Sequence, residues 1–236
     1  MSAPAHKPLV YIISAPSGSG KSTLVNELLK SARDLDFSIS YTTRAPRGSE
    51  INGKQYYFVS RSEFEKMIRD DEFLEHAEGF GNYYGTARRF LREAEKKGHD
   101  LLLDIDVQGA AQIQQKLPDA TSIFILPPDR KTLEERLRKR SEDLEQVIQL
   151  RLVMASREIQ NYDRYNYILI NDLLQESSKN LQAIVQSEHL LRSGNTLSDK
   201  EAQTVALADR WRLANVRDRV KRILDSFKPP EDSGTA

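Results

Sequence analysis

The chain has 236 residues, of which 39% are hydrophobic, enough for a buried core in one large domain with an appendage. The chain has 35 basic residues (lysine plus arginine) and 35 acidic residues (aspartate plus glutamate). The composition therefore indicates neither the excess of positive charge that attracts nucleic acids nor the excess of negative charge typical of acidic disordered chains. The absence of cysteine excludes disulfides, thiol catalysis and cysteine-ligated metals, and it is compatible with a reducing compartment. The four histidines lack metal-ligand spacing.

The N-terminal segment contains a short apolar run at residues 9–13. This run is too short for a membrane span or for the core of a signal peptide, and no conventional cleavage site follows it. We therefore expect a soluble, cytoplasmic protein that makes no contact with a membrane.

Continuous apolar runs of strand length predict strands that are covered on both faces, because they lack the alternation of half-exposed strands. Segments with helical periodicity separate them, and Asp129 is expected to cap one further helix. The strands are expected at 9–13, 101–105, 122–126 and 167–170, and the helices at 21–31, 87–97 and 107–116. This order predicts an α/β fold with a parallel sheet flanked by helices.

Two segments depart from this alternation. Residues 37–86 contain short β-rich stretches separated by arginine, proline and glycine, which predicts a small, mostly β subdomain inserted into the core.

At the C-terminal end, residues 194–202 resemble a linker, and residues 203–227 resume a helical pattern before a tail that is expected to fray. The helical stripe consists of Val216, Val220, Ile223, Leu224 and Phe227. Packing of this helix on its own subunit or on a second copy of the chain is the expected role, and nucleic-acid or membrane contact is the alternative.

Residues 15–23, APSGSGKST, match the phosphate-loop pattern G-x-x-x-x-G-K-[ST], except that Ala15 stands where the pattern has glycine. A strand is expected before this stretch and a helix after it, an arrangement that points backbone N–H groups at one anion. Alanine at position 15 costs little if its φ is negative. Lys21 is expected to contact the β- and γ-phosphates. The expected ATP-binding residues of the loop are Ala15, Pro16, Ser17, Gly18, Ser19, Gly20, Lys21, Ser22 and Thr23.

A magnesium site is expected beside the loop. Asp104 and Asp106 follow the apolar run at 101–103, and acids two residues apart on a strand point to the same side. A carboxylate at a strand end suits Mg²⁺ bound to a nucleotide, so Ser22 and Asp104 are the expected ligands. Solvated acids at a strand terminus are the alternative.

The phosphoryl acceptor must be recognised by other residues. The Asn-Lys-x-Asp motif of GTPases and the Leu-Ser-Gly-Gly-Gln motif of ABC ATPases are absent. Arginines and tyrosines gather in the inserted segment, where guanidinium groups match phosphate oxygens and phenols add neutral hydrogen bonds. The cluster comprises Ser40, Arg44, Arg47, Tyr56, Glu75, Tyr84 and Thr86.

The stretches SYTTRAPRGSEINGKQYYFVS, EFLEHAEGFGNYYGT and LLLDIDVQGA resemble, in order and spacing over about residues 8–188, the signature segments of the bacterial guanylate kinase family. The resemblance implies transfer of a phosphoryl group from ATP to GMP. A carboxylate suits the paired N–H donors of guanine, and a hydroxyl suits its O6. By this resemblance Arg44, Arg47, Tyr56 and Tyr84 hold the GMP phosphate, and Ser40, Glu75, Thr86 and Asp106 read the guanine.

The resemblance also implies a mobile lid whose arginines reach the triphosphate. Arg136 and Arg140 lie four residues apart on one expected helix, and Arg151 lies on the next. The family usually has Gly-Arg-Gly where this chain has Lys139-Arg140-Ser141, which puts the local hinge geometry in question. Asn171 matches an asparagine that the family places near the adenine.

Together these features predict a kinase in which Lys21, Arg44, Arg140, Arg151 and Mg²⁺ supply positive charge around the transferred phosphoryl group, with no covalent nucleophile. The predicted organisation is a kinase domain at 8–188 and a helical extension at 189–236. Within the domain the core is expected at about 8–36, 100–128 and 165–188, the GMP-binding subdomain at about 37–99 and the lid at about 129–164.

Two alternatives remain open. Guanylate-kinase-like domains of scaffold proteins bind peptides without catalysis, but they usually have damaged phosphate loops, whereas Lys21 and Ser22 are intact here. A sugar-phosphate kinase on the same core would not be expected to carry the guanine-reading residues.

Overall fold

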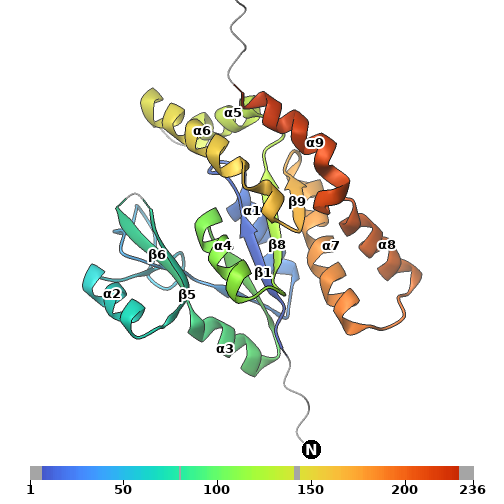
Figure 1. The fold of residues 1–236 in the computed structure, drawn as a ribbon, viewed down its shortest axis with the longest axis horizontal. Helices are drawn as coiled ribbons and strands as arrows, with labels where there is room; N and C mark the ends of the chain where they lie inside the picture. The colour runs from blue at the N-terminus through green and yellow to red at the C-terminus, as the bar shows by residue number, and fades with distance from the viewer. Residues whose placement is uncertain (1–6, 80, 141–143, 229–236) are drawn as a thin grey trace, which may run out of the picture. The chain divides into compact units, whose positions relative to one another are not determined.

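The computed structural model describes residues 7–79, 81–140 and 144–228 (Figure 1). The chain divides into two compact units, one of residues 1–14 and 25–122 and the other of residues 15–24 and 123–236. Among the described residues, no helix is both long enough and apolar enough to cross a membrane.

The first unit contains three parallel strands of the expected sheet. In it β7 (Asp100–Asp104) pairs with β1 (Val10–Ser14) on one side and with β2 (Leu35–Ser38) on the other. Leu101, Leu102 and Leu103 are fully buried, in agreement with their continuous apolar run. Helix α3 (Arg88–Lys97) contacts β7 and β2, and α4 (Val107–Lys116) contacts β1.

The same unit contains the inserted β subdomain, a second sheet with the strand order β4-β3-β6-β5. These strands are β3 (Tyr41–Thr42), β4 (Tyr57–Phe58), β5 (Phe73–Gly79) and β6 (Asn82–Ala87). Figure 1 shows β5 and β6 as a long antiparallel pair beside α2 (Arg61–Arg69). The ring of Phe64 from α2 stacks on Phe73 and Tyr83 and so closes a small aromatic core.

Strand β8 (Thr121–Leu126) starts in the last two residues of the first unit. Its residues from Ile123 onward belong to the second unit and pair in parallel with β9 (Tyr167–Ile170). Along the chain, the connection from β8 to β9 contains α5 (Arg130–Arg140), α6 (Glu145–Ile159) and the short 3₁₀ helix η1 (Tyr162–Arg164). After β9 follow α7 (Leu174–Ser193), α8 (Asp199–Asp209) and α9 (Leu213–Ser226). Helix α1 (Lys21–Ser31) begins in this unit and continues into the first.

The structure confirms the expected strands and helices and corrects three details. The boundary expected at residue 37 falls inside β2, whose Phe37 and Ser38 pair with the parallel strand β7. The inserted segment also contains helix α2, where the sequence indicated mostly strands.

The third correction concerns the expected linker at 194–202, because α8 begins within it. Ser198 and Glu201 form a capping box there: the Ser198 side chain accepts from the Glu201 N–H, and the Glu201 carboxylate accepts from the Ser198 N–H. These polar residues, which suggested a loop, are those that start a helix.

Candidate functional site

The loop of residues 15–20 connects β1 to α1 and has the backbone that the phosphate-loop pattern requires. Gly18 and Gly20 have φ of +90° and +88°, where a side chain would be strained. Asp71 is the only non-glycine residue of the described chain with positive φ, so Ala15 is unstrained, as expected. Helix α1 has no acidic residue in its first turn, which leaves its positive N-terminal end for an anion.

Asn171, just after β9, holds this loop from the side. Its Nδ2 donates to the Ser19 carbonyl at 2.7 Å, in a buried position. A Cβ on Gly20 would lie 2.3 Å from the same Nδ2, so only glycine admits the amide there. The sequence suggested contact with the adenine, and the structure adds a structural role that spacing alone does not reveal.

Two buried polar atoms, one in the loop and one beside it, are unpaired within the described chain. Ser19 Oγ and Asn171 Oδ1 have no hydrogen-bond partner among the described residues. Such atoms carry a free-energy cost unless a ligand or water satisfies them. Ser17, Ser22 and Thr23 are exposed, and Lys21 is half-buried.

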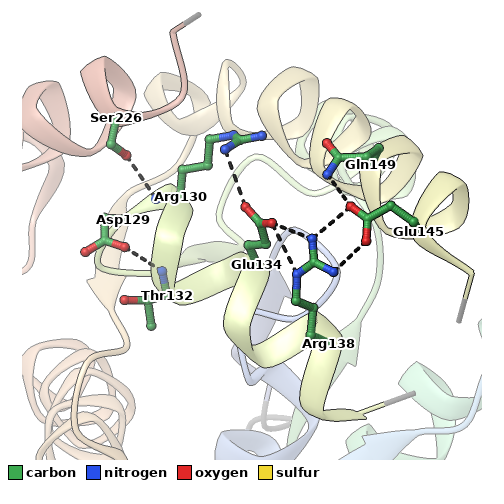
Figure 2. Close-up of polar contacts among 8 residues, drawn as sticks. All are labelled: Asp129, Arg130, Thr132, Glu134, Arg138, Glu145, Gln149 and Ser226. Carbon is green, nitrogen blue, oxygen red and sulfur yellow. Dashed lines mark hydrogen bonds and ion pairs between the residues drawn. The ribbon is translucent and has the colours of Figure 1, made fainter. Parts of the chain in front are cut away.

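The helices expected to form the lid are joined by one arginine. Arg138 of α5 donates to Glu145 Oε2 of α6 at 2.6 Å and to Glu134 Oε1 of its own helix at 2.7 Å (Figure 2). Arg151 lies half-buried on α6. The side chain of Arg140 and residue Ser141 lie outside the described part of the chain, so the expected hinge at these residues is not described.

In the first unit, Glu75 is an acid buried in the β subdomain. It is 4% exposed and lies opposite Thr86 in the pairing of β5 with β6. Burial raises the pKa of Glu75 to about 7, and the negative charge of Asp106 adds to the rise. Thr86 Oγ1 is fully buried and has no hydrogen-bond partner of normal geometry among the described residues, although it lies near enough to Glu75 to oppose the rise of that pKa.

Gly109 of α4 makes room for the Glu75 carboxylate. A Cβ on Gly109 would lie 2.6 Å from Glu75 Oε2, closer than side chains approach. Asp106 caps the same helix, because its Oδ1 accepts from the N–H groups of Gln108 and Gly109 at 2.9 and 2.8 Å. Strand β7 ends at Asp104, so Asp106 does not continue the strand as the two-residue spacing suggested.

Two of the predicted phosphate ligands, Tyr56 and Tyr84, gather beside a third, Arg44. The two Nη atoms of Arg44 donate to the two carboxylate oxygens of Glu50, each at 3.0 Å. This ion pair raises the pKa of Arg44 and lowers that of Glu50. The guanidinium lies 5.3 Å from the centre of the Tyr56 ring, and the edge of Tyr56 meets Tyr84 at 6.0 Å between ring centres.

The described contacts therefore form two groups in the first unit, Glu75 with Thr86 and Asp106, and Arg44 with Tyr56 and Tyr84. Ser40 and the exposed Arg47 are joined to neither by a hydrogen bond of their side chains within the described chain. Sequence reasoning missed Glu50 and Gly109. Both lie inside quoted signature stretches, but their roles depend on which side chains they face.

A parallel sheet with a glycine-rich loop, a lysine and a helix whose first turn has no acidic residue defines a phosphate-loop nucleotide-binding protein. Comparison with known proteins narrows this class. The guanylate kinase family model matches residues 7–188. A guanylate kinase from Koribacter versatilis is 53% identical over 226 residues, covering 94% of this chain and 97% of the relative.

A guanylate kinase from Escherichia coli (strain K12) is 48% identical over 186 residues, 78% of this chain and 90% of the relative. The crystal structure of guanylate kinase from Anaplasma phagocytophilum superimposes with a TM-score of 0.64 and 35% identity, covering 78% of this chain and 87% of that one. The chain belongs to the guanylate kinase family. The Koribacter relative aligns over more of the chain than the family model does, which places most of the C-terminal extension within the similarity.

Proposed function

We propose that this chain transfers the γ-phosphoryl group of ATP to GMP, giving ADP and GDP. The observation that carries the proposal is the buried pair of Glu75 and Thr86. Guanine presents N1–H and N2–H side by side, which one carboxylate can accept together, and its O6 can accept from a hydroxyl. Binding of guanine would satisfy both buried groups, whereas adenine lacks this set of partners.

The GMP phosphate is assigned to Arg44, Arg47, Tyr56 and Tyr84. A guanidinium and two phenol groups suit a phosphate dianion, and Arg44 is already oriented by its ion pair with Glu50. Ser40 and Asp106 complete the proposed guanine-binding set, in which Asp106 Oδ2 is used by none of the described hydrogen bonds.

ATP is assigned to residues 15–23 and Asn171. The loop N–H groups and the start of α1 would hold the phosphates, with Lys21 on the β- and γ-phosphates. The unpaired Ser19 Oγ and Asn171 Oδ1 support a polar ligand at this loop.

Mg²⁺ is proposed to enter with ATP. Among the described residues no group of three or more acids or histidines could hold a metal alone. Mg²⁺ bound largely by phosphates and water needs only one or two protein oxygens, and the Ser22 hydroxyl and Asp104 carboxylate fit that requirement. When bound, the ion neutralises charge on the phosphates.

Catalysis is assigned to alignment and positive charge. Phosphoryl transfer through a loose transition state needs the attacking oxygen in line with the leaving group and cations around the moving phosphoryl group. Lys21, Arg44, Arg140 and Arg151 are the proposed cations of the chain. Exclusion of water from the reacting groups would limit ATP hydrolysis.

Two further parts of the proposal concern the cellular location of the protein and its association with other chains. Its substrates are consistent with a cytoplasmic role in purine nucleotide metabolism. A second copy of the chain is a further proposed partner. The molecular mass of the protein in solution would test this proposal.

A coupled assay of ADP formation with GMP, AMP and UMP as acceptors tests the proposal. We expect turnover with GMP and turnover lower by at least about 100-fold with AMP and UMP, because buried unpaired groups strongly disfavour the wrong base. Equal rates with all three nucleotides would contradict the base assignment, and no transfer to any would contradict the activity.

A further inference from the structure

The C-terminal extension is attached to the edge of β9. The Ile168 N–H donates to the Trp211 carbonyl at 2.8 Å, and the Leu213 N–H donates to the Asn166 carbonyl at 3.0 Å. Arg212 lies 4.7 Å over the ring of Tyr167 and donates to Glu188 of α7. The segment thus pairs with β9, the strand that ends one residue before the loop-holding Asn171.

The extension also reaches the start of α5. Ser226, the last residue of α9, accepts through Oγ from the N–H of Arg130, the first residue of α5, at 3.0 Å (Figure 2). Asp129 accepts from the Thr132 N–H at 2.6 Å in the same helical turn. The first N–H groups of a helix have no partner within it, so Ser226 supplies one from 96 residues away.

The apolar stripe of α9 holds Ser226 at this position. Val216 and Val220 are fully buried, and Ile223 and Phe227 are less than 9% exposed. Helix α9 contacts α5 and β9, so the stripe packs on its own subunit, one of the two expected arrangements. The Ser226 hydroxyl also donates to the Ile223 carbonyl at 2.6 Å, which fixes its orientation.

Helix α5 in turn lies against the phosphate loop. A Cβ on Gly18 would lie 2.8 Å from Leu137 and 3.0 Å from Leu133, both buried on α5. Arg136 of α5 donates to the carbonyls of Asn171 and Asp172 at 2.9 and 3.1 Å. A shift of α5 would therefore move both the wall of the loop and the segment that carries Asn171.

We propose that residues 211–227 form a brace for the phosphate loop, and that Ser226 is a positioning residue for ATP binding. Ser226 acts through α5, and the brace acts through β9, on the loop that receives the phosphates. The inference rests on the assignment of this loop to ATP. On this proposal the extension supports nucleotide binding. It is neither a passive tail nor a surface that binds a second macromolecule.

The test compares Ser226→Ala with Ser193→Ala in the full-length chain. Ser193 is a close match: it ends α7, and its Oγ donates to the carbonyl three residues earlier, at 2.7 Å. Within the described chain Ser193 Oγ accepts only from the nearby Asn195 N–H, whereas Ser226 accepts from another helix. Ser226→Thr retains the hydroxyl and serves as the rescue variant.

Calorimetric titration with a non-hydrolysable ATP analogue, and separately with GMP, provides the readout. We expect Ser226→Ala to raise the dissociation constant of the ATP analogue about fivefold, the effect of one lost helix-capping hydrogen bond. The GMP constant should stay unchanged, Ser193→Ala should match the unmodified chain, and Ser226→Thr should restore ATP binding.

The brace is contradicted if Ser226→Ala binds the ATP analogue as Ser193→Ala does, or if it weakens both nucleotides equally. A lower melting temperature with unchanged affinities would likewise show a cap that serves stability alone. Lys21→Ala in the same titration distinguishes a failure of the ATP-site assignment from a failure of the brace. If Lys21→Ala binds the analogue normally, the loop is not the ATP site, and both the ATP-site assignment and the brace fail. If Lys21→Ala does not bind the analogue while Ser226→Ala binds it normally, only the brace fails.

Discussion

At the scale of single residues, Glu75 is the least exposed acid of the described chain, at 4%. Its raised pKa of about 7 results from burial first and from the charge of Asp106 second. In the absence of a ligand this carboxylate is partly protonated near neutral pH. A guanine that offers two N–H donors would favour the ionised form, so GMP binding should release protons.

The raised pKa makes a stability prediction. An acid whose pKa rises from 4.5 to about 7 on folding binds more protons in the folded state between these values, so stability falls as pH rises through this window. The loss reaches up to about 3 kcal/mol above pH 7. Glu75→Gln cannot titrate, so its stability lacks this dependence on pH. The unfolding free energy of Glu75→Gln minus that of the unmodified chain should therefore rise from pH 5 to pH 8.

Urea unfolding of the ligand-free protein at several pH values measures this difference. Glu78→Gln, an exposed position on the same strand, is the matched control and should follow the unmodified chain. Curves for Glu75→Gln and the unmodified chain that stay parallel between pH 5 and pH 8 would show that Glu75 does not titrate in this range.

Arg44 carries a second prediction at this scale. Glu50 holds both Nη atoms of Arg44, in a pair whose side chains are 10% and 23% exposed, and it also accepts from the Arg47 N–H at 2.7 Å. Glu50→Gln should loosen Arg44 and raise the GMP dissociation constant about tenfold, the scale of a largely buried charge-assisted pair, with ATP binding unchanged.

Calorimetry with each nucleotide checks this expectation. Glu65→Gln is the control, because Glu65 pairs with Arg61 in an exposed ion pair of small energetic value. Tighter GMP binding by Glu50→Gln would reverse the interpretation, since it would mean that Glu50 competes with the GMP phosphate for Arg44.

At the scale of elements, helix α4 and strand β5 pack against each other and carry the residues proposed to bind guanine. Gln112 of α4 accepts from the His76 N–H and donates to the His76 carbonyl, and Lys116 donates to the Leu74 carbonyl at 2.6 Å. The helix therefore holds the strand on both sides of Glu75. The helix approaches the carboxylate closely at Gly109, where no side chain intervenes.

Gly109→Ala tests this packing. A methyl group 2.6 Å from Glu75 Oε2 must displace the carboxylate or the helix, at a cost of about 1–3 kcal/mol in stability. We expect the KM for GMP to rise at least about tenfold with little change in the KM for ATP. Gln108→Ala, exposed on the same helix, should leave both constants unchanged. A KM for GMP equal to that of Gln108→Ala would show that the carboxylate does not need this space.

Most elements were predictable because their signals are local. The continuous apolar runs gave the strands, and helix α1 and helix α4 begin and end at the expected residues. The edge of the inserted subdomain was misplaced because Phe37 and Ser38 belong to β2, which only its pairing with β7 reveals. The start of α8 was missed because serine and acidic residues fit a loop and a capping box equally well.

At the scale of the whole molecule, the chain consists of two compact units with different proposed ligands. The phosphate loop, Asn171 and the brace belong to one unit, and the groups of Glu75 and Arg44 belong to the other. The loop motif was readable from sequence because its glycines and lysine are consecutive. The contacts that Asn171, Glu50, Gly109 and Ser226 make could not be predicted from the sequence. Each of these residues contacts a partner that its own position in the sequence does not indicate.

The central claim is that Glu75 selects guanine, and the ratio of kcat/KM for GMP to that for AMP tests it most directly. With Glu75→Gln, the side-chain amide can accept only through its oxygen and places donors against the donors of guanine. We predict that this ratio falls at least about 100-fold in Glu75→Gln, while the KM for ATP and the circular dichroism spectrum stay unchanged. An undiminished preference for GMP in Glu75→Gln would contradict the account.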